Sequence, residues 1–133
     1  DLAETDIYYL HTMIASTRGY LKTRRDRALR FLRGFLEGIA YFKQNKKESL
    51  EIVRRKLRIN ADQERNLERS YDLLATKYYE AMPYPSLRGV ETVLSLVEKD
   101  NPKAKEADPK SFVDDSLLRE IDASGFLKTL YPR

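Results

Sequence analysis

The chain of 133 residues contains no cysteine. This absence excludes disulfide bonds, thiolate metal sites and a cysteine nucleophile within the chain, but it does not decide the compartment, because a periplasmic protein can also lack disulfides. Glycine and proline are scarce, with five of each, and no apolar run approaches the roughly 20 residues that cross a bilayer. We therefore expect one compact, helix-rich domain of ordinary size with no membrane-spanning segment.

The chain also has little excess of either charge: 25 Lys and Arg residues stand against 21 Asp and Glu residues, for a formal net charge of +4. A general polyanion-binding protein usually has a larger basic excess. One local cluster still permits a nucleic-acid interpretation, since arginines on a helix can follow phosphates; it comprises Lys22, Arg24, Arg25, Arg27, Arg30 and Arg33. Arg27, Arg30 and Arg33 fall opposite the apolar stripe of their helix, so a solvated helix face is the simpler interpretation.

The segment from Ile7 to Ala15 is rich in β-branched and aromatic residues, which predicts a strand. A lone strand cannot satisfy its own backbone donors and acceptors. Its pairing partners should therefore be missing from this sequence or belong to another chain.

A helical pattern begins at Thr23, where Thr23 to Asp26 fits an N-terminal capping box. Apolar residues then recur at spacings of three and four, widened by Phe31 and Leu36; the stripe is Ala28, Leu32, Phe35, Ile39 and Phe42. Gly34 and Gly38 lie four apart inside this helix, each at a cost of up to about 1 kcal/mol relative to alanine. They indicate either close packing against a neighbouring element or tolerated surface glycines.

Four further helices follow from the same spacing rules. They cover about Lys46–Arg58, about Asp62–Tyr79, a segment capped by Ser86 that ends before Pro102, and Ser116–Ser124 with Gly125 as its stop. Tyr71 and Tyr78 lie on the apolar face of the second of these helices and are expected in the core. The stretch Asn101–Pro109 reads as a polar surface loop, and an apolar tail with Phe126 and Tyr131 closes the chain. The fold class is thus mostly α, with about five helices and one N-terminal strand.

Catalytic chemistry has little support in this composition. The single histidine, His11, has no second histidine or cysteine to share a zinc ion, so a packed or cleft-lining role is simpler. Asp114 and Asp115 are adjacent at a helix start, where capping explains them better than paired acid–base work. Phosphate-binding glycine loops, nucleophile elbows and metalloprotease motifs are absent from the sequence. We expect no enzyme, no catalytic residue, no metal and no cofactor.

Several segments taken in order resemble one family: the nitrate/sulfonate/taurine-type substrate-binding proteins of ABC importers, which includes binders of thiamine-pyrimidine precursors. These segments are Tyr8–Ala15 followed by Ser16–Leu21, the helix with Phe31–Ile39, the turn Tyr41–Glu48, Pro83-Tyr84-Pro85 and Phe112-Val113-Asp114. Together they span nearly the whole chain. The weight of the resemblance lies in their order and spacing.

The resemblance implies a type II periplasmic-binding-protein fold, with two α/β lobes and a solute held in the cleft between them. Residues 1–21 would be a returning hinge strand and its connection, and residues 22–133 the C-terminal helical part. Most ligand contacts would lie upstream, which leaves Tyr9, His11 and Thr12 beside the hinge as candidate ligand-binding residues. The chain would then be an excerpt of a longer protein that opens and closes about this hinge.

The same resemblance implies the partners: a small, anionic or heteroaromatic solute and an ABC permease in the membrane, with no nucleic acid. The parent would be periplasmic or anchored by lipid at the cell surface. Apolar faces without their sheet should favour a dimer or higher oligomer. Two alternatives stay open: a helical interaction or nucleic-acid-binding module using the Arg-rich face, and an enzyme of related architecture, because thiamine-pyrimidine synthases resemble the same binding proteins.

Overall fold

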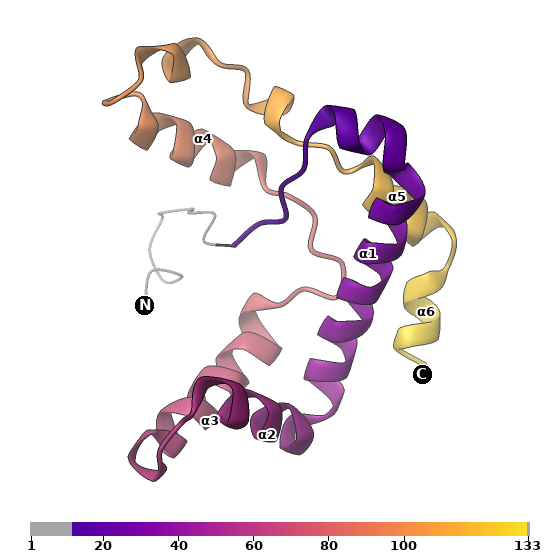
Figure 1. Cartoon of the computed structure of the whole chain (residues 1–133), viewed down its shortest axis with the longest axis vertical. Helices are drawn as coiled ribbons and strands as arrows, with labels where there is room; N and C mark the ends of the chain where they lie inside the picture. Colours follow the sequence, from indigo (N-terminus) through magenta and orange to yellow (C-terminus); the bar gives the residue numbers. More distant parts are fainter. Residues whose placement is uncertain (1–11, 133) are drawn as a thin grey trace. The chain divides into compact units, whose positions relative to one another are not determined.

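The computed structural model describes residues 12–132, and six α-helices occur within that range (Figure 1). The chain divides into two compact units. One unit combines the residues up to Arg25 with Tyr84–Arg119, and the other combines Asp26–Pro83 with the residues from Glu120 onward. The mostly helical fold class expected from the sequence is confirmed for the described residues.

No strand occurs in the range 12–132. The predicted strand from Ile7 to Ala15 lies partly outside this range, and its described part, residues 12–15, has no regular secondary structure. For that part the prediction is wrong. An apolar, β-branched run fits a pleated surface, but it forms a strand only where another strand supplies the paired amides and carbonyls.

Helix α1 (Arg18–Gln44) begins five residues before the predicted start at Thr23. Thr17 is its cap, because the Thr17 hydroxyl accepts a hydrogen bond of 3.1 Å from the amide of Tyr20. The Thr23 hydroxyl instead donates to the carbonyl of Gly19 at 2.9 Å, so the capping box expected at Thr23 is wrong. The helix continues past Thr23 and is kinked at Arg24, which leaves helical geometry with φ −133° and ψ 32°.

In the second unit, α1 is followed by a helical hairpin of α2 (Lys46–Leu57) and α3 (Glu64–Leu73) (Figure 1). Arg58 ends α2 in the left-handed region, with φ 54°. A 3₁₀ turn, Ala61–Gln63, precedes α3, and a π-helical turn, Leu74–Tyr78, continues it. The helices expected at about Lys46–Arg58 and Asp62–Tyr79 are therefore confirmed, the second in three successive geometries.

In the first unit, Ser86 caps α4 (Leu87–Val97) as expected, accepting a hydrogen bond of 3.2 Å from the amide of Gly89. The stretch expected to be a loop contains a 3₁₀ turn, Pro102–Glu106, and a second one, Pro109–Phe112, follows. The side chains of Asn101 and Asp108 accept hydrogen bonds from the amides two residues later, which initiates these turns.

Helix α5 (Ser116–Ala123) matches its prediction, and the Asp114 carboxylate accepts a hydrogen bond of 3.0 Å from the Ser116 amide at its start. Gly125 stops the helix at φ 75°, where glycine carries no steric penalty. The expected apolar tail is a short helix, α6 (Phe126–Leu130). The Gln44 amide donates to the Leu130 carbonyl at 2.7 Å, which ties α6 to the end of α1 in the second unit.

The core is small. In the second unit the buried apolar residues are Leu36, Ile39, Ala40, Leu50, Tyr71, Ala75 and Ile121; the first unit buries Ala104, Leu117 and Leu118. Tyr71 is core as expected, whereas Tyr78 is 40% exposed, so the prediction that Tyr78 lies in the core is wrong. The π-helical turn widens the backbone at Tyr78, and this change of period moves side chains off the face that a regular helix would present.

Candidate binding site

The structure describes one of the three residues proposed for ligand binding. Tyr9 and His11 lie outside the described residues. Thr12 lies at the beginning of the described range, exposed and before the first helix. Their association with a hinge therefore stays a prediction from the resemblance.

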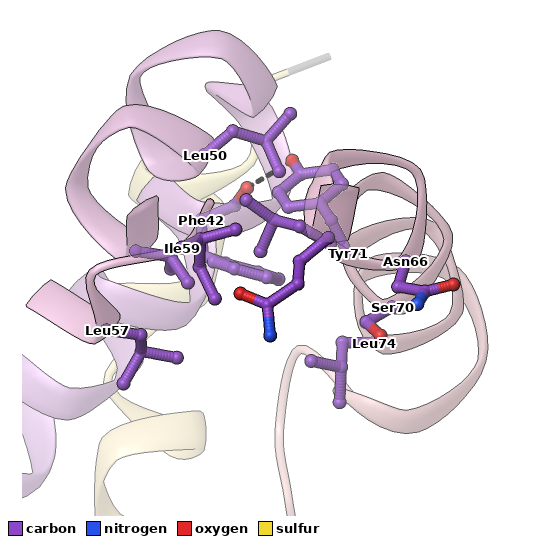
Figure 2. A pocket seen from close by; sticks show the side chains of 11 residues that line it. Phe42, Leu50, Leu57, Ile59, Asn66, Ser70, Tyr71 and Leu74 are labelled. Carbon is purple, nitrogen blue, oxygen red and sulfur yellow. Dashed lines mark hydrogen bonds between the residues drawn. The ribbon is translucent and has the colours of Figure 1, made fainter. Parts of the chain in front are cut away.

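A hollow of about 340 Å³ lies in the second unit between α2 and α3 (Figure 2). Its wall is mostly aliphatic and aromatic. We call it the hairpin hollow, and its lining consists of Phe42, Leu50, Val53, Leu57, Ile59, Gln63, Asn66, Leu67, Ser70, Tyr71 and Leu74. A volume of this size is at the lower end of pockets that hold small molecules.

Tyr71 lines the hairpin hollow and is held in place by two contacts with Phe42. Its hydroxyl donates a hydrogen bond to the carbonyl of Phe42, as Figure 2 shows, and its ring lies 4.6 Å from the Phe42 ring, centroid to centroid. Because Phe42 is in the last turn of α1, its carbonyl has no partner within the helix and needs one from outside. Ser49 supplies a second, longer donor at 3.4 Å. Tyr71 thus satisfies a carbonyl in the last turn of α1 and also lines the hollow.

Two ion pairs join α2 to α3. Lys46 Nζ lies 2.6 Å from Asp72 Oδ1 at one end of the hairpin. At the other end Arg54 donates two hydrogen bonds to Glu64, the one from Nε at 3.0 Å. The Arg54 guanidinium lowers the pKa of Glu64 below its ordinary value, chiefly through these hydrogen bonds. None of these four side chains lines the hollow, whose lining contains no charged residue.

The polar groups of the hollow come from α3 and the turn before it. Asn66 and Ser70 are four residues apart and so share one side of α3. Neither side chain forms a hydrogen bond with the described part of the chain. Gln63 uses its Oε1 to accept from the Asn60 amide at 3.2 Å, which leaves its NH₂ group as a donor. The hollow therefore has an apolar body and one polar edge.

A second feature of this unit is the outer side of α1, which we call the α1 aromatic face: Phe31, Gly34, Phe35, Gly38 and Tyr41. Phe31 is 59% exposed and Phe35 is 40% exposed, although both were expected in the apolar stripe. A Cβ built at Gly34 or Gly38 would meet no described atom within 4 Å. Close packing at these glycines is therefore not seen within residues 12–132, and both sites are open.

The arginines of α1 do not all lie on a solvated face. Arg27 and Arg30 are exposed, as expected. Arg33 is half-buried instead, with its guanidinium carbon 5.5 Å from the centroid of the Phe126 ring. Arginine stacks readily on aromatic rings because its charge is delocalised and weakly hydrated. The expectation of a solvated Arg33 is therefore wrong.

The first unit has a hollow of about 400 Å³ whose lining combines apolar and charged side chains, among them Tyr84 and Lys110. In it the Arg119 guanidinium carbon lies 5.6 Å from the centroid of the Tyr84 ring, and Arg119 pairs with Asp115 at 2.7 Å. The two aspartates expected to serve the helix start have separate tasks: Asp114 caps α5, and Asp115 holds Arg119. Within the described residues, no group of three or more His, Cys, Asp or Glu side chains is placed to hold a metal ion.

Sequence reasoning did not identify either hollow. The signal for the hairpin hollow was present in part, since Leu50, Val53 and Leu57 form one apolar stripe and Leu67, Tyr71 and Leu74 form the next. Two facing stripes joined by a short connection predict a helical hairpin. They do not predict that the helices diverge enough to leave a space.

Comparisons of the chain with protein-family models, with curated proteins and with solved structures found no match. Along the described part of the chain, no helix combines the length and the apolar character needed to span a bilayer.

Proposed function

We propose that this chain is the helical part of a solute-binding component of an ABC importer. In this proposal the component captures a small anionic or heteroaromatic solute between two lobes and delivers it to a permease in the membrane. The proposal rests on the ordered resemblance segments and on one structural observation, the apolar character of α1 on two sides.

Helix α1 buries Leu36, Ile39 and Ala40 on one side within the second unit. On its other side the α1 aromatic face is exposed. Apolar faces on two sides of a helix are normally both covered by other parts of a structure, because an exposed aromatic ring lacks the free energy of burial. In α/β lobes a helix meets such conditions where it lies between a sheet and other helices. Gly34 and Gly38 would let that second layer approach closely.

The proposal can be tested with the protein expressed from the complete reading frame that encodes this chain. The measurement is whether a candidate solute raises the Tm of that protein. Nitrate, taurine, alkanesulfonates, aromatic acids and pyrimidine precursors form the panel. A ligand at 100 times its Kd stabilises the folded state by about 2.7 kcal/mol, so a true solute should raise Tm in a saturable way. If no member of the panel raises Tm and the protein binds DNA with strong salt dependence, the nucleic-acid alternative replaces this proposal.

The α1 aromatic face also leads us to propose that the isolated chain associates with itself. Sedimentation velocity over a range of concentrations should show a dimer or higher oligomer. The double variant Phe31→Ser/Phe35→Ser should shift the chain to monomer, because it removes two exposed aromatic rings from the contact. Ile52→Ser, on the exposed side of α2, is the matched control and should leave association unchanged. A monomer at all concentrations would contradict this part of the proposal.

A further inference from the structure

We propose that the hairpin hollow binds a small neutral molecule that has one ring or a short branched apolar body and a single hydrogen-bonding group. This inference does not depend on the proposed function, whose solute would lie in a cleft between lobes. It rests on the size of the hollow, on its mostly apolar lining and on the absence of charged side chains from that lining.

Size and boundaries favour a small ligand over a partner helix. The hollow has about 340 Å³, which suits one ring with a short substituent. The Lys46–Asp72 and Arg54–Glu64 pairs link α2 and α3 at both ends of the hairpin. A partner helix would need a groove that continues past these ends.

Lining and charge determine the ligand chemistry. Leu57 and Ile59 keep exposed surface that a ligand would cover, and Leu57 is 67% exposed. Burial of this surface supplies the attraction. Asn66 and Ser70 offer an amide and a hydroxyl that bond no described residue, so an alcohol, phenol or amide group gains a partner there. No charged side chain lines the hollow, so an anionic ligand would lose hydration without a compensating contact.

A methyl-resolved NMR titration of the chain with p-cresol tests the inference. The methyl signals of Leu57, Ile59 and Leu67 should shift and saturate together, while that of Ile52, outside the hollow, should not move. Toluene, which lacks the hydroxyl, and p-toluate, which carries a charge, should each bind at least about tenfold more weakly, a difference of about 1.4 kcal/mol. Equal affinity for p-cresol and p-toluate would overturn the assigned chemistry.

Matched variants locate the site. Leu57→Gln makes the wall polar at an exposed position and should weaken p-cresol binding about fivefold, whereas Ile52→Gln on the same helix should have no effect. The double variant Asn66→Ala/Ser70→Ala should remove the preference for p-cresol over toluene. The inference is overturned if no methyl signal saturates, if Leu57→Gln binds normally, or if the same signals shift on concentrating the chain alone, which would make a second copy the occupant.

Discussion

Tyr71 connects the end of α1 to the α2–α3 hairpin, and the variant Tyr71→Phe isolates the contribution of one hydroxyl. The ring and its contact with Phe42 remain, while the hydrogen bond to the Phe42 carbonyl is lost. Tyr71 is only 5% exposed, so water has little access to replace the hydroxyl. The variant therefore tests whether this bond stabilises the second unit.

The expected loss follows from two terms. A typical intramolecular hydrogen bond contributes about 1 kcal/mol net, and a buried acceptor left without a partner costs about 1–3 kcal/mol. The Ser49 hydroxyl, at 3.4 Å from the same carbonyl, reduces the second term. We expect Tyr71→Phe to lower the free energy of unfolding by about 1–2 kcal/mol, and Tyr71→Ala, which also leaves a cavity, by about 3–5 kcal/mol.

Urea unfolding followed by far-UV circular dichroism measures this loss. Tyr41→Phe is the control, because Tyr41 is exposed and its hydroxyl bonds nothing in the described part of the chain; its effect should stay within about 0.5 kcal/mol. If Tyr71→Phe is no more destabilising than Tyr41→Phe, the hydroxyl does not anchor α1 to the hairpin and the reasoning is refuted.

The same variant has a pH signature. Burial raises the pKa of the Tyr71 hydroxyl above its ordinary value of 10.0, and the nearby Lys46 offsets this only in part. A pKa that is higher in the folded state means that the protonated form is favoured by folding. The corresponding stability is complete below pH 10 and is lost as the pH rises through the folded value. The difference between wild type and Tyr71→Phe should therefore narrow in strongly alkaline solution.

Three further predictions concern helix ends and the hairpin. Ser86→Ala removes the cap of α4 and should lower the free energy of unfolding by about 1 kcal/mol in urea titrations; no loss would mean that the cap bond is not stabilising. Arg58→Gly should raise the unfolding free energy by up to about 1 kcal/mol, because glycine adopts φ 54° without strain, and Arg55→Gly inside α2 should lower it. The pKa of Glu64 is lowered by Arg54 in the folded state, so stability is complete above pH 4.5 and is lost as the pH falls through the folded value. Glu64→Gln should flatten that acid-side decline, and an unchanged decline would contradict the Arg54–Glu64 pairing.

Local sequence signals located most helices because their boundaries depend on nearby residues. Ser86 caps α4 and Gly125 stops α5 through contacts within a few positions of the chain. Thr23 shows the limit of such signals. Its hydroxyl can either cap a helix or bond the carbonyl four residues back, and the choice depends on whether Thr17 has already begun the helix.

The parts that the sequence did not predict depend on tertiary packing. The apolar stripe of α1 is wide, so periodicity alone did not show that Leu36 and Ile39 are buried while Phe31 and Phe35 are exposed. The hairpin hollow likewise depends on how far α2 and α3 diverge. Tyr9 and His11 lie outside the described residues, so their ligand-binding role stays a prediction.

Solute uptake by cells that lack the gene for this chain tests the proposed transport function most directly. Uptake of radiolabelled nitrate, taurine, alkanesulfonates, aromatic acids and pyrimidine precursors would be compared in wild-type, deletion and complemented cells. We expect the deletion to abolish high-affinity uptake of one of these solutes and complementation to restore it. Wild-type uptake of every solute in the deletion strain would contradict the proposed function.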